Sequence, residues 1–518
     1  MIENSSENQR ESEKNYFFLV ALLLSIPLLL HLLTNIFGSF GIFRDEFYYM
    51  ACSNRLDFGY VDQPPLSIFI LAVNRFLFGD SIFALRLLPA INSGLTVLFT
   101  CLMVIRLGGR KAAIIISSLA TIFAPVYLGM NSIYSMNSFD TLLWSIAFYL
   151  IILIIEKNNL SYWILLGIVL GIGLLNKIGF LWLGFGFLAG LLFTDKRKML
   201  LTFKPYLTAL IALLIFSPFI FWNFQNDFAH IEFIRNATSG KYSGLNAKDF
   251  IIGQLSNMNP ASLIVWGAGL YYFLFNKTGK KFRILGIIYV TTFLILIING
   301  HSKAGYLASA YTVLFAGGGV FIESVTSLKF KWLKYVIAVF IIVLGVIITP
   351  LALPILPVET YIKYADKLGF APTTSEDKEL SELPQFYADM FGWEEMAKNV
   401  SKVYLTIPEN ERSNVLFFGN NYGEAGAIEF FAKKYPLPKA ISSHNNFWLW
   451  GFGNYKDPII IVIGGERKDH LEVFENVEEA GFHSTKYSMP YENNLPIFIA
   501  KKIKTDINET WKRIKHFE

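Results

Sequence analysis

Residues 40–66 read FGIFRDEFYYMACSNRLDFGYVDQPPL and lie between two apolar runs that are long enough to span a membrane. This stretch holds Arg44 beside the acidic residues Asp45, Glu46, Asp57 and Asp62. A charged residue at bilayer depth costs roughly 2.5–3.5 kcal/mol. We therefore expect the charges that follow the first span to serve a function, and we take this stretch as the first candidate for chemistry.

The composition predicts a polytopic membrane protein. Hydrophobic residues make up 53% of the 518-residue chain and charged residues only 16%, whereas a soluble domain carries about a quarter charged residues. No long basic run indicates nucleic-acid binding, and two cysteines, Cys52 and Cys101, make a disulfide framework improbable. The apolar run at 17–37 is too long for a signal-peptide core, so we interpret it as a retained first helix.

The apolar runs predict about eleven transmembrane helices, since each span needs about 20 apolar residues. We place them near 17–38, 82–105, 112–130, 139–155, 161–175, 178–193, 206–222, 260–275, 284–300, 306–322 and 335–353. Basic residues follow the second, sixth, eighth and tenth of these helices. With eleven spans these loops share one side, which the positive-inside rule makes cytoplasmic. We therefore predict a cell-membrane protein with a cytoplasmic N-terminus and an external C-terminal region.

The prolines of PLALPILP, from Pro350, end the membrane part, and the composition then becomes that of a soluble domain. We predict a transmembrane domain at 1–353, with a catalytic external loop at 39–81, and an external α/β domain at 354–518. Within the latter, 415–418 and 459–463 are β-rich, and 424–434 and 470–479 are predicted helices.

Asp45 is the first candidate catalytic residue. The side chains of neighbouring residues on a helix point about 100° apart, so Asp45 and Glu46 cannot share one face. We expect one of the two carboxylates to enter a cleft and the other to bind a cation, a backbone amide or Arg44. The functional interpretation makes Asp45 a general base for an acceptor hydroxyl or amine. The alternative is a helix cap or a pair of interfacial charges.

Asp140, in NSIYSMNSFDTLLW, begins the fourth predicted span on the same predicted side. It is a second functional carboxylate or a cap favoured by the helix dipole. Two cations, Lys177 in GLLNKIGFLW and Lys303 in NGHSKAGYLASAY, are candidates for an anionic lipid headgroup, with Tyr306 beside Lys303. For Lys177 the alternative is snorkelling to the interface.

These parts suit a sugar carried on a polyprenyl phosphate. The lipid chain needs a membrane, the phosphate needs Lys or Arg, and attack at the anomeric carbon needs one base. The phosphate leaves as an anion, so positive charge replaces a general acid. A glycosidase, by contrast, uses two carboxyl groups.

Four segments resemble the GT-C superfamily of membrane glycosyltransferases, in particular the protein O-mannosyltransferase and lipid A aminoarabinose transferase group. They are RDEFYYMACSNRLDFGYVDQPPL, SMNSFDTLLW, HSKAGYLASAYTVLFAGGGVFIE and NYGEAGAIEFF…SSHNNFWLWGFG. The resemblance implies inverting transfer from a polyprenyl-phosphate sugar, with Asp45 as the catalytic carboxylate and Asp140 in support. It also implies that Lys303 and Lys177 serve the lipid phosphate, and we predict Arg44, Tyr306 and Gln63 as further contacts of the donor phosphate.

One departure concerns Gln63, because aminoarabinose transferases place a lysine immediately before Pro-Pro. Gln donates a hydrogen bond but carries no charge, which puts phosphate contact at this position and the aminoarabinose assignment in doubt. Some GT-C relatives bind a divalent metal. Asp45, Glu46 and Asp140 could supply oxygen ligands, although the sequence requires no cofactor.

The segment SSHNNFWLWG offers His444, Asn445 and Trp448 for stacking on a sugar or an acceptor. Packing between the external domain and the membrane part explains these residues as well. The sequence leaves the sugar open and allows a protein, lipid A, cell-wall polymer or glycolipid acceptor.

The rival classes are a transporter or flippase of a lipid-linked or anionic substrate, and a sensor. A carrier shows internal symmetry, which this sequence lacks, and a sensor does not need Asp45, Glu46 and Asp140 beside the membrane.

Overall fold

The computed structural model describes residues 2–374, 376 and 378–518. By internal contacts the chain divides into two units. We name the first the helical unit; it comprises the chain up to Gly38, Phe83–Phe221 and Leu245–Leu356. We name the second the mixed unit; it comprises Ser39–Ile82, Trp222–Gly244 and Pro357–Glu518. The stretch around Asp45 therefore belongs with the C-terminal region, although it lies far from it in the sequence.

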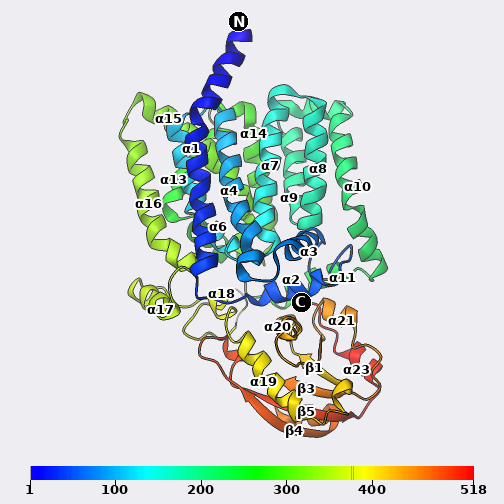
Figure 1. The fold of residues 1–518 in the computed structure, drawn as a ribbon. Coiled ribbons are helices and arrows are strands. Elements are labelled where there is room, and N and C mark those ends of the chain that lie inside the picture. The colour runs from blue at the N-terminus through cyan, green and yellow to red at the C-terminus, as the bar shows by residue number, and fades with distance from the viewer. Residues whose placement is uncertain (1, 375, 377) are drawn as a thin grey trace. The chain divides into compact units, whose positions relative to one another are not determined.

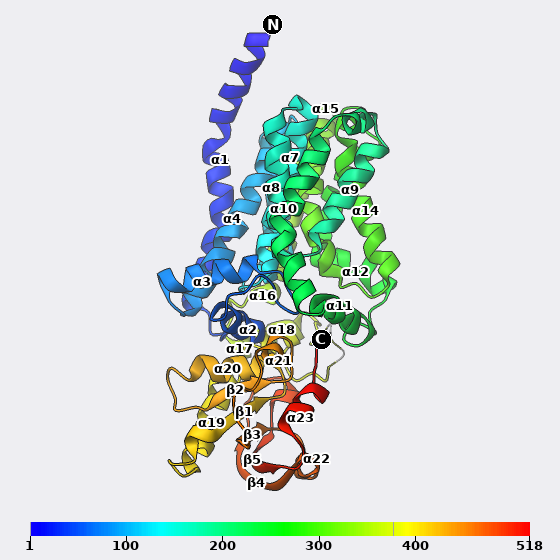
Figure 2. The ribbon, with the colours of Figure 1, turned by 90° about the vertical axis from the view of Figure 1, so that its right-hand side faces the viewer.

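The helical unit is a bundle whose long helices run side by side (Figures 1 and 2). Its α-helices are α1 (Ile2–Phe37), α4 (Ile82–Arg106), α5 (Lys111–Ile122), α6 (Pro125–Met130), α7 (Met136–Lys157), α8 (Leu160–Asn176), α9 (Phe180–Leu192), α10 (Lys204–Gln225, whose last turn belongs to the mixed unit), α12 (Ala247–Asn257), α13 (Leu263–Leu274), α14 (Arg283–Asn299), α15 (Tyr311–Leu328) and α16 (Leu333–Ala352). Short 3₁₀ turns are η1 (Asp195–Leu201), η2 (Pro260–Ser262), η3 (Gly279–Phe282) and η4 (Ala304–Ala310).

Helices occur at all eleven predicted positions. In the described part of the chain, seven of them are long and apolar enough to cross a membrane alone: Tyr16–Phe37, Ile82–Arg106, Met136–Lys157, Lys204–Gln225, Gly279–Asn299, Ala304–Leu328 and Leu333–Ala352. Shorter apolar helices, including α5, α8, α9 and α13, account for the remaining positions. The predicted third span is divided, because α5 ends at Ile122 and Pro125 starts α6.

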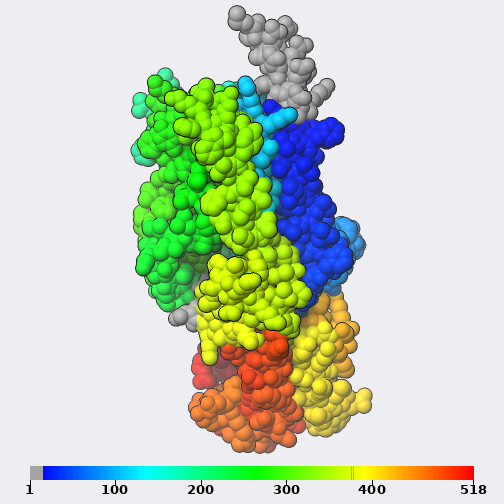
Figure 3. Space-filling view, turned by 90° about the vertical axis from the view of Figure 1, so that its left-hand side faces the viewer, coloured from blue at the N-terminus to red at the C-terminus, as the bar shows by residue number. Residues whose placement is uncertain are grey.

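Apolar side chains distinguish the inside of the helical unit from its surface. The centres of α7 and α15 are largely buried, whereas α16 exposes apolar side chains such as Val339, Phe340 and Val346. Figure 3 shows α16, in yellow-green, on the surface of this unit. Exposed apolar side chains over a whole helix are expected where the solvent is lipid.

Glycines let α13 and α15 approach closely. A Cβ atom on Gly318 would collide with the backbone oxygen of Val265, and one on Gly269 would collide with that of Leu314. Small residues at such contacts are a common means of packing helices in membranes.

The mixed unit contains a five-stranded sheet with the order β2-β1-β3-β5-β4. Its strands are β1 (Val415–Gly419), β2 (Lys439–Ser442), β3 (Ile459–Ile463), β4 (Phe474–His483) and β5 (Leu495–Ile503). Strand β1 pairs in parallel with β2 and β3, and β5 pairs antiparallel with β3 and β4. Strand β3 is buried along its whole length, as expected for an inner strand covered on both faces.

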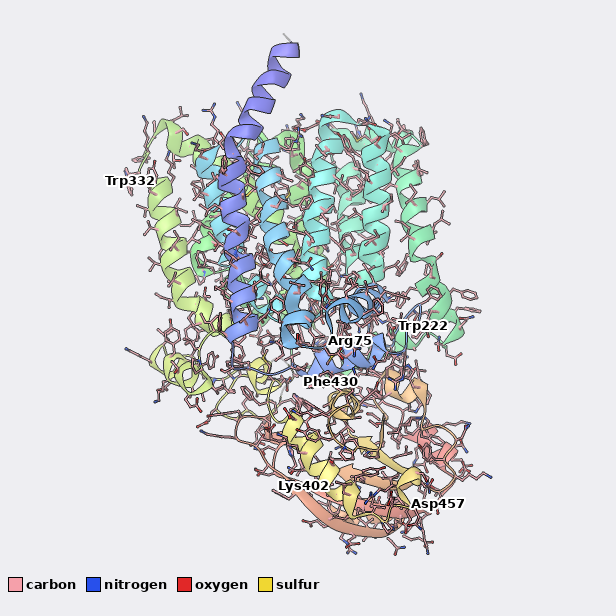
Figure 4. The ribbon with its side chains drawn as sticks, viewed as in Figure 1. Arg75, Trp222, Trp332, Lys402, Phe430 and Asp457 are labelled. Atoms are coloured by element: carbon pink, nitrogen blue, oxygen red, sulfur yellow. The ribbon has the colours of Figure 1, made fainter. Side chains whose placement is uncertain are left out.

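The helices of the mixed unit come from three parts of the chain: α2 (Arg44–Ser53), α3 (Leu66–Phe78), α11 (Ala229–Ser239), α17 (Val358–Lys367), α18 (Gln385–Ala388), α19 (Trp393–Thr406), α20 (Tyr422–Phe431), α21 (Asn446–Trp450), α22 (Arg467–Val473) and α23 (Ile507–Arg513), with the 3₁₀ turns η5 (Arg412–Asn414) and η6 (Pro490–Glu492). Figure 4 labels Lys402 on α19 and Asp457 just before β3. Asn414 donates a hydrogen bond to the backbone oxygen of Asp457 and so joins the starts of β1 and β3.

The predicted strands at 415–418 and 459–463 coincide with β1 and β3, but the predicted helix at 470–479 is wrong after Val473. Helix α22 ends there, and β4 begins at Phe474. Phe474 and Val477 are buried three residues apart, a spacing that resembles a helix. Strand β4 pairs with β5 as far as His483, with an irregularity between Glu479 and Gly481. This pairing, and not the local spacing, determines the conformation.

Candidate functional site

Helix α2 starts at Arg44, and its second acidic residue caps it. The side chain of Glu46 is buried, and its Oε2 accepts a hydrogen bond from the backbone N–H of Phe43 over 2.8 Å. This bond satisfies an N–H group that the first turn leaves without a helical partner. The geometry gives Glu46 a capping role and leaves its neighbour to face outward.

Asp45 is that neighbour, and its side chain is 37% exposed. Its Oδ1 accepts a hydrogen bond from the hydroxyl of Tyr422 over 2.8 Å and lies 3.5 Å from Nε of Arg44. Both of these contacts reach Oδ1. In the described part of the chain, Oδ2 has no hydrogen bond or ion pair of this kind.

Arg44 is surrounded by acceptors of its own unit. Its side chain is 11% exposed, Nη1 donates to the hydroxyl of Tyr491 over 2.8 Å, and carboxylate oxygens of Asp389 and Glu376 lie 3.6 and 3.5 Å away. Glu376 also pairs with Lys241 at 3.0 Å. Arg44 thus joins α2 to the C-terminal region, and this arrangement competes with the predicted contact to a donor phosphate.

Asp62 is a further carboxylate of the stretch 40–66, with no role predicted from the sequence. Its Oδ1 accepts a hydrogen bond from the hydroxyl of Tyr48 over 2.8 Å, and Asn446 Oδ1 lies 3.0 Å from the same hydroxyl. Burial raises the pKa of Asp62 to about 7, against the opposing effect of the bond from Tyr48. A carboxyl with a pKa near neutral pH is suited to proton transfer. Its place directly before Gln63-Pro-Pro is the signal that could have identified it.

The loop that carries Asp62 is held from both sides. The backbone N–H of Val61 donates to Asn446 Oδ1 over 2.7 Å, and the backbone oxygen of Val61 lies 2.9 Å from Nδ1 of His230. The amide of Gln63 is fully buried, and neither of its polar atoms has a hydrogen-bond partner among the described residues. A buried amide in that state is a candidate for contact with a ligand or with water.

The residues predicted to bind a sugar, His444, Asn445 and Trp448, contact the segment 511–518. Nε2 of His444 and Nδ2 of Asn445 lie 2.8 and 3.3 Å from the backbone oxygen of Glu518. Trp448 donates from Nε1 to the backbone oxygen of Trp511 over 2.8 Å. These contacts favour the packing interpretation for Asn445 and Trp448. The ring of His444 is also packed, at a tilt, against the ring of Tyr422, with 4.7 Å between the ring centres, and Tyr422 in turn contacts Asp45.

The helical unit brings together Asp140, Lys177 and Tyr306. Asp140 is buried on α7, and its Oδ2 accepts a hydrogen bond from Ser309 over 2.6 Å. Lys177, between α8 and α9, donates to Asn137 Oδ1 over 2.8 Å, and its Nζ lies 5.2 Å from the centre of the Tyr306 ring. Asn137 stands three residues before Asp140 on α7, so the cation and the carboxylate share one polar cluster within an apolar bundle.

Lys303 lies at the start of η4, and its backbone oxygen accepts from the N–H of Tyr306 over 3.0 Å. Asp140, Lys177 and Lys303 thus belong to the helical unit, whereas Arg44, Asp45, Glu46 and Gln63 belong to the mixed unit.

A divalent metal would need several oxygen or nitrogen ligands at one point. Glu46 caps α2, and both contacts of Asp45 are to Oδ1. Among the described residues no group of three His, Cys, Asp or Glu side chains comes together to hold a metal ion. Asp45 and Glu46 belong to the mixed unit and Asp140 to the helical unit, and no step proposed below uses a metal.

Sequence comparison finds relatives over part of the chain. The family described as dolichyl-phosphate-mannose-protein mannosyltransferase matches residues 62–222, a segment that contains Asp140 and Lys177 but not Asp45. An undecaprenyl phosphate-alpha-4-amino-4-deoxy-L-arabinose arabinosyl transferase of Erwinia tasmaniensis is 27% identical over 194 residues, 34% of each chain. One of the same name from Pseudomonas savastanoi is 26% identical over 125 residues, 24% of this chain and 23% of that protein. The chain thus matches about a quarter to a third of the length of these relatives.

Structural similarity extends over nearly the whole chain. The crystal structure of ArnT from Cupriavidus metallidurans bound to undecaprenyl phosphate aligns with 94% of this chain and 98% of its own, with a TM-score of 0.59 and 12% identity. The archaeal oligosaccharyltransferase AglB from Archaeoglobus fulgidus, in complex with an inhibitory peptide and a dolichol-phosphate, aligns with 82% of this chain and 64% of its own, with a TM-score of 0.51 and 13% identity.

These similarities confirm the fold class and the recognition made from the sequence. The chain thus has the GT-C fold of ArnT, it is similar to a mannosyltransferase family over residues 62–222, and its described part contains seven helices that are long and apolar enough to cross a membrane.

Proposed function

We propose that this protein is an inverting glycosyltransferase that moves a sugar from a polyprenyl-phosphate donor to an acceptor at the outer face of the membrane. The observation that carries the proposal is the partly exposed carboxylate of Asp45, in a chain whose fold matches ArnT bound to undecaprenyl phosphate. The similar proteins are named as arabinosyl transferases, and this name supports the same class of reaction.

Asp45 is the general base of the proposed reaction. The acceptor hydroxyl or amine attacks the anomeric carbon, and its proton passes to Oδ2 of Asp45. The bond between the anomeric carbon and the phosphate oxygen breaks, and the electron pair leaves with the phosphate. One base and no general acid are sufficient, because the leaving phosphate is already a stable anion. Asp62, whose pKa burial raises to about 7, is a further carboxyl of the mixed unit that can exchange a proton.

Lys177 and Lys303 are the proposed cations for the donor phosphate. An ammonium has three N–H donors, and Lys177 gives one of them to Asn137. Asp140 provides a nearby negative charge that holds the cation in the bundle. Positive charge at the leaving phosphate favours bond breaking, since it stabilises the charge that develops in the transition state.

Arg44 and Gln63 take different parts in the proposal. Arg44 is engaged by Tyr491, Asp389 and Glu376, so we assign it to holding α2 and leave it out of the phosphate site. Gln63 keeps two buried amide atoms for the donor. A neutral amide suits a sugar hydroxyl as well as a phosphate oxygen.

The sidedness of the reaction is part of the proposal. The positive-inside rule, applied to the basic loops after α4, α9, α13 and α15, makes those loops cytoplasmic. The mixed unit then lies outside, where a lipid-linked sugar meets an acceptor of the cell envelope.

The decisive experiment supplies purified protein in proteoliposomes with radiolabelled polyprenyl-phosphate sugars and candidate acceptors. Movement of label from the lipid to a protein, lipid or polymer acceptor is the expected result. Passage of intact labelled lipid to the other leaflet, with no sugar transferred, would favour the transporter or flippase instead.

A further inference from the structure

Helix α20 begins at the residue that contacts Asp45. Tyr422 is its first residue, directly after the loop that follows β1. The side chain of Asn421 caps the helix, because its Oδ1 accepts from the backbone N–H groups of Gly423 and Glu424 over 2.8 and 3.1 Å. An Asn cap of this kind fixes where the helix starts, and with it the position of Tyr422.

Two buried carboxyl groups reinforce this cap. Oε2 of Glu424 accepts from the backbone N–H of Asn420 over 2.7 Å, and Oε1 of Glu492 accepts from Nδ2 of Asn421 over 2.7 Å. Both side chains are almost fully buried. The loop before Tyr422 is therefore held from its backbone and from its side chains.

Two glycines allow α20 to pack closely against α2. A Cβ atom on Gly423 would collide with Cγ of Arg44, and a Cβ on Gly426 would lie 3.0 Å from the backbone carbon of Phe47. The two glycines stand three residues apart and face the same neighbour. At Gly426 the neighbour is the backbone of Phe47, which adjusts less easily than a flexible side chain, so this contact limits how closely α20 can approach α2.

The ring of Tyr422 is fixed from several directions. Its centre lies 4.7 Å from the ring of Tyr48 and 4.7 Å from that of His444, and the guanidinium carbon of Arg44 lies 5.7 Å from it. Burial raises the pKa of Tyr422 above its ordinary value, so its hydroxyl stays protonated and donates. These neighbours hold the ring while its hydroxyl contacts Asp45.

We infer that Tyr422 is a positioning residue that holds Oδ1 of Asp45 and so directs Oδ2 toward the acceptor. The inference rests on the proposed role of Asp45 as the base. It gives the C-terminal region a part in the reaction, because the hydrogen bond joins residues 377 positions apart in the sequence. A base held in one orientation is more effective, since a misplacement of about 1 Å can lower a rate by about 100-fold.

The test is Tyr422→Phe, which removes the hydroxyl and keeps the ring. Its matched control is Tyr435→Phe, because Tyr435 donates a similar bond to a carboxylate, Glu394, over 2.6 Å in the same unit. We expect kcat of Tyr422→Phe to fall at least tenfold with the KM for the donor unchanged, and kcat of Tyr435→Phe to stay within twofold of wild type. A merely structural role would lower the amount of folded enzyme for both variants and would not separate kcat from KM.

A second variant covers the case in which Tyr422→Phe does not fold. Gly426→Ala should move α20 away from α2 and lower kcat with Tyr422 intact, whereas Gly244→Ala, whose Cβ would meet nothing within 4 Å, should not. Equal kcat for Tyr422→Phe and Tyr435→Phe, alongside an inactive Asp45→Asn, would overturn the inference and leave the proposed function standing. An active Asp45→Asn would overturn the proposed function itself.

Discussion

The hydroxyl of Tyr48 donates a hydrogen bond to Oδ1 of Asp62 over 2.8 Å, yet burial still raises the pKa of Asp62 to about 7. The folded protein therefore holds a proton on Asp62 between about pH 4 and pH 7 that the unfolded chain has released. The contribution to stability is fully present below the ordinary pKa and is lost as the pH rises through 7. One such proton changes the free energy of unfolding by about 1.4 kcal/mol per pH unit.

Asp62→Asn should flatten this dependence, because the amide does not titrate. The check is the melting temperature of purified protein at pH 5, 6, 7 and 8 for the wild type and the variant. The control is Asp469→Asn, on an exposed residue of α22, which should keep the wild-type slope. Equal slopes for all three proteins would show that Asp62 does not hold this proton.

Glu492→Gln should stabilise the mixed unit at alkaline pH. Burial raises the pKa of both Glu424 and Glu492, so the pair retains a proton that it must lose as the pH increases. Gln keeps the oxygen that accepts from Asn421 and can donate toward Glu424 without a charge. We expect a higher melting temperature than wild type at pH 9 and little difference at pH 5. Glu472→Gln, at an exposed position, is the control, and a lower melting temperature of Glu492→Gln at pH 9 would contradict this account.

Lys177→Ala and Lys303→Ala should each raise the KM for the polyprenyl-phosphate donor about tenfold, which corresponds to about 1.4 kcal/mol. The physical reason is the loss of a cation from the proposed phosphate site. Lys280→Ala, at an exposed position in a different loop, serves as the control. The measurement varies donor and acceptor separately. A parallel increase in both KM values would remove these lysines from the phosphate site.

The proposed sidedness predicts opposite labelling of two introduced cysteines. Both native cysteines, Cys52 and Cys101, are buried, so background labelling should be low. Lys512→Cys, on the exposed surface of α23, should react with an impermeant maleimide in intact cells. Lys280→Cys, in a predicted cytoplasmic loop, should react only after the membrane is opened. The reverse pattern would place the mixed unit in the cytoplasm.

The sequence predicted the helices well because each apolar run carries its own signal. The positions of α4, α7, α14 and α16 follow from length and hydropathy alone. The helix predicted at 470–479 failed at Phe474, because the burial of Phe474 and Val477 has a helical spacing while the partner strand β5 lies more than twenty residues later in the chain. Local pattern cannot detect a distant partner strand.

The candidate site was predictable only in part for the same reason. Asp45, Asp140 and Lys177 stand out as charges beside apolar runs. The capping bond of Glu46 and the acidic surroundings of Arg44 depend on geometry and on residues such as Asp389 and Tyr491. Tyr422 had no local signal at all, because a tyrosine at the start of a helix is ordinary until its hydroxyl is seen against Asp45.

The most direct test of the central claim is sugar transfer by Asp45→Asn. Single-turnover transfer from a radiolabelled polyprenyl-phosphate sugar is measured for wild type, Asp45→Asn and Glu466→Gln, an exposed acidic residue before α22. General-base catalysis contributes typically about 10²–10⁴-fold, so Asp45→Asn should lose at least about 100-fold while its expression, melting temperature and donor binding match the wild type. Transfer by Asp45→Asn at the wild-type rate would contradict the assignment of Asp45 as the base.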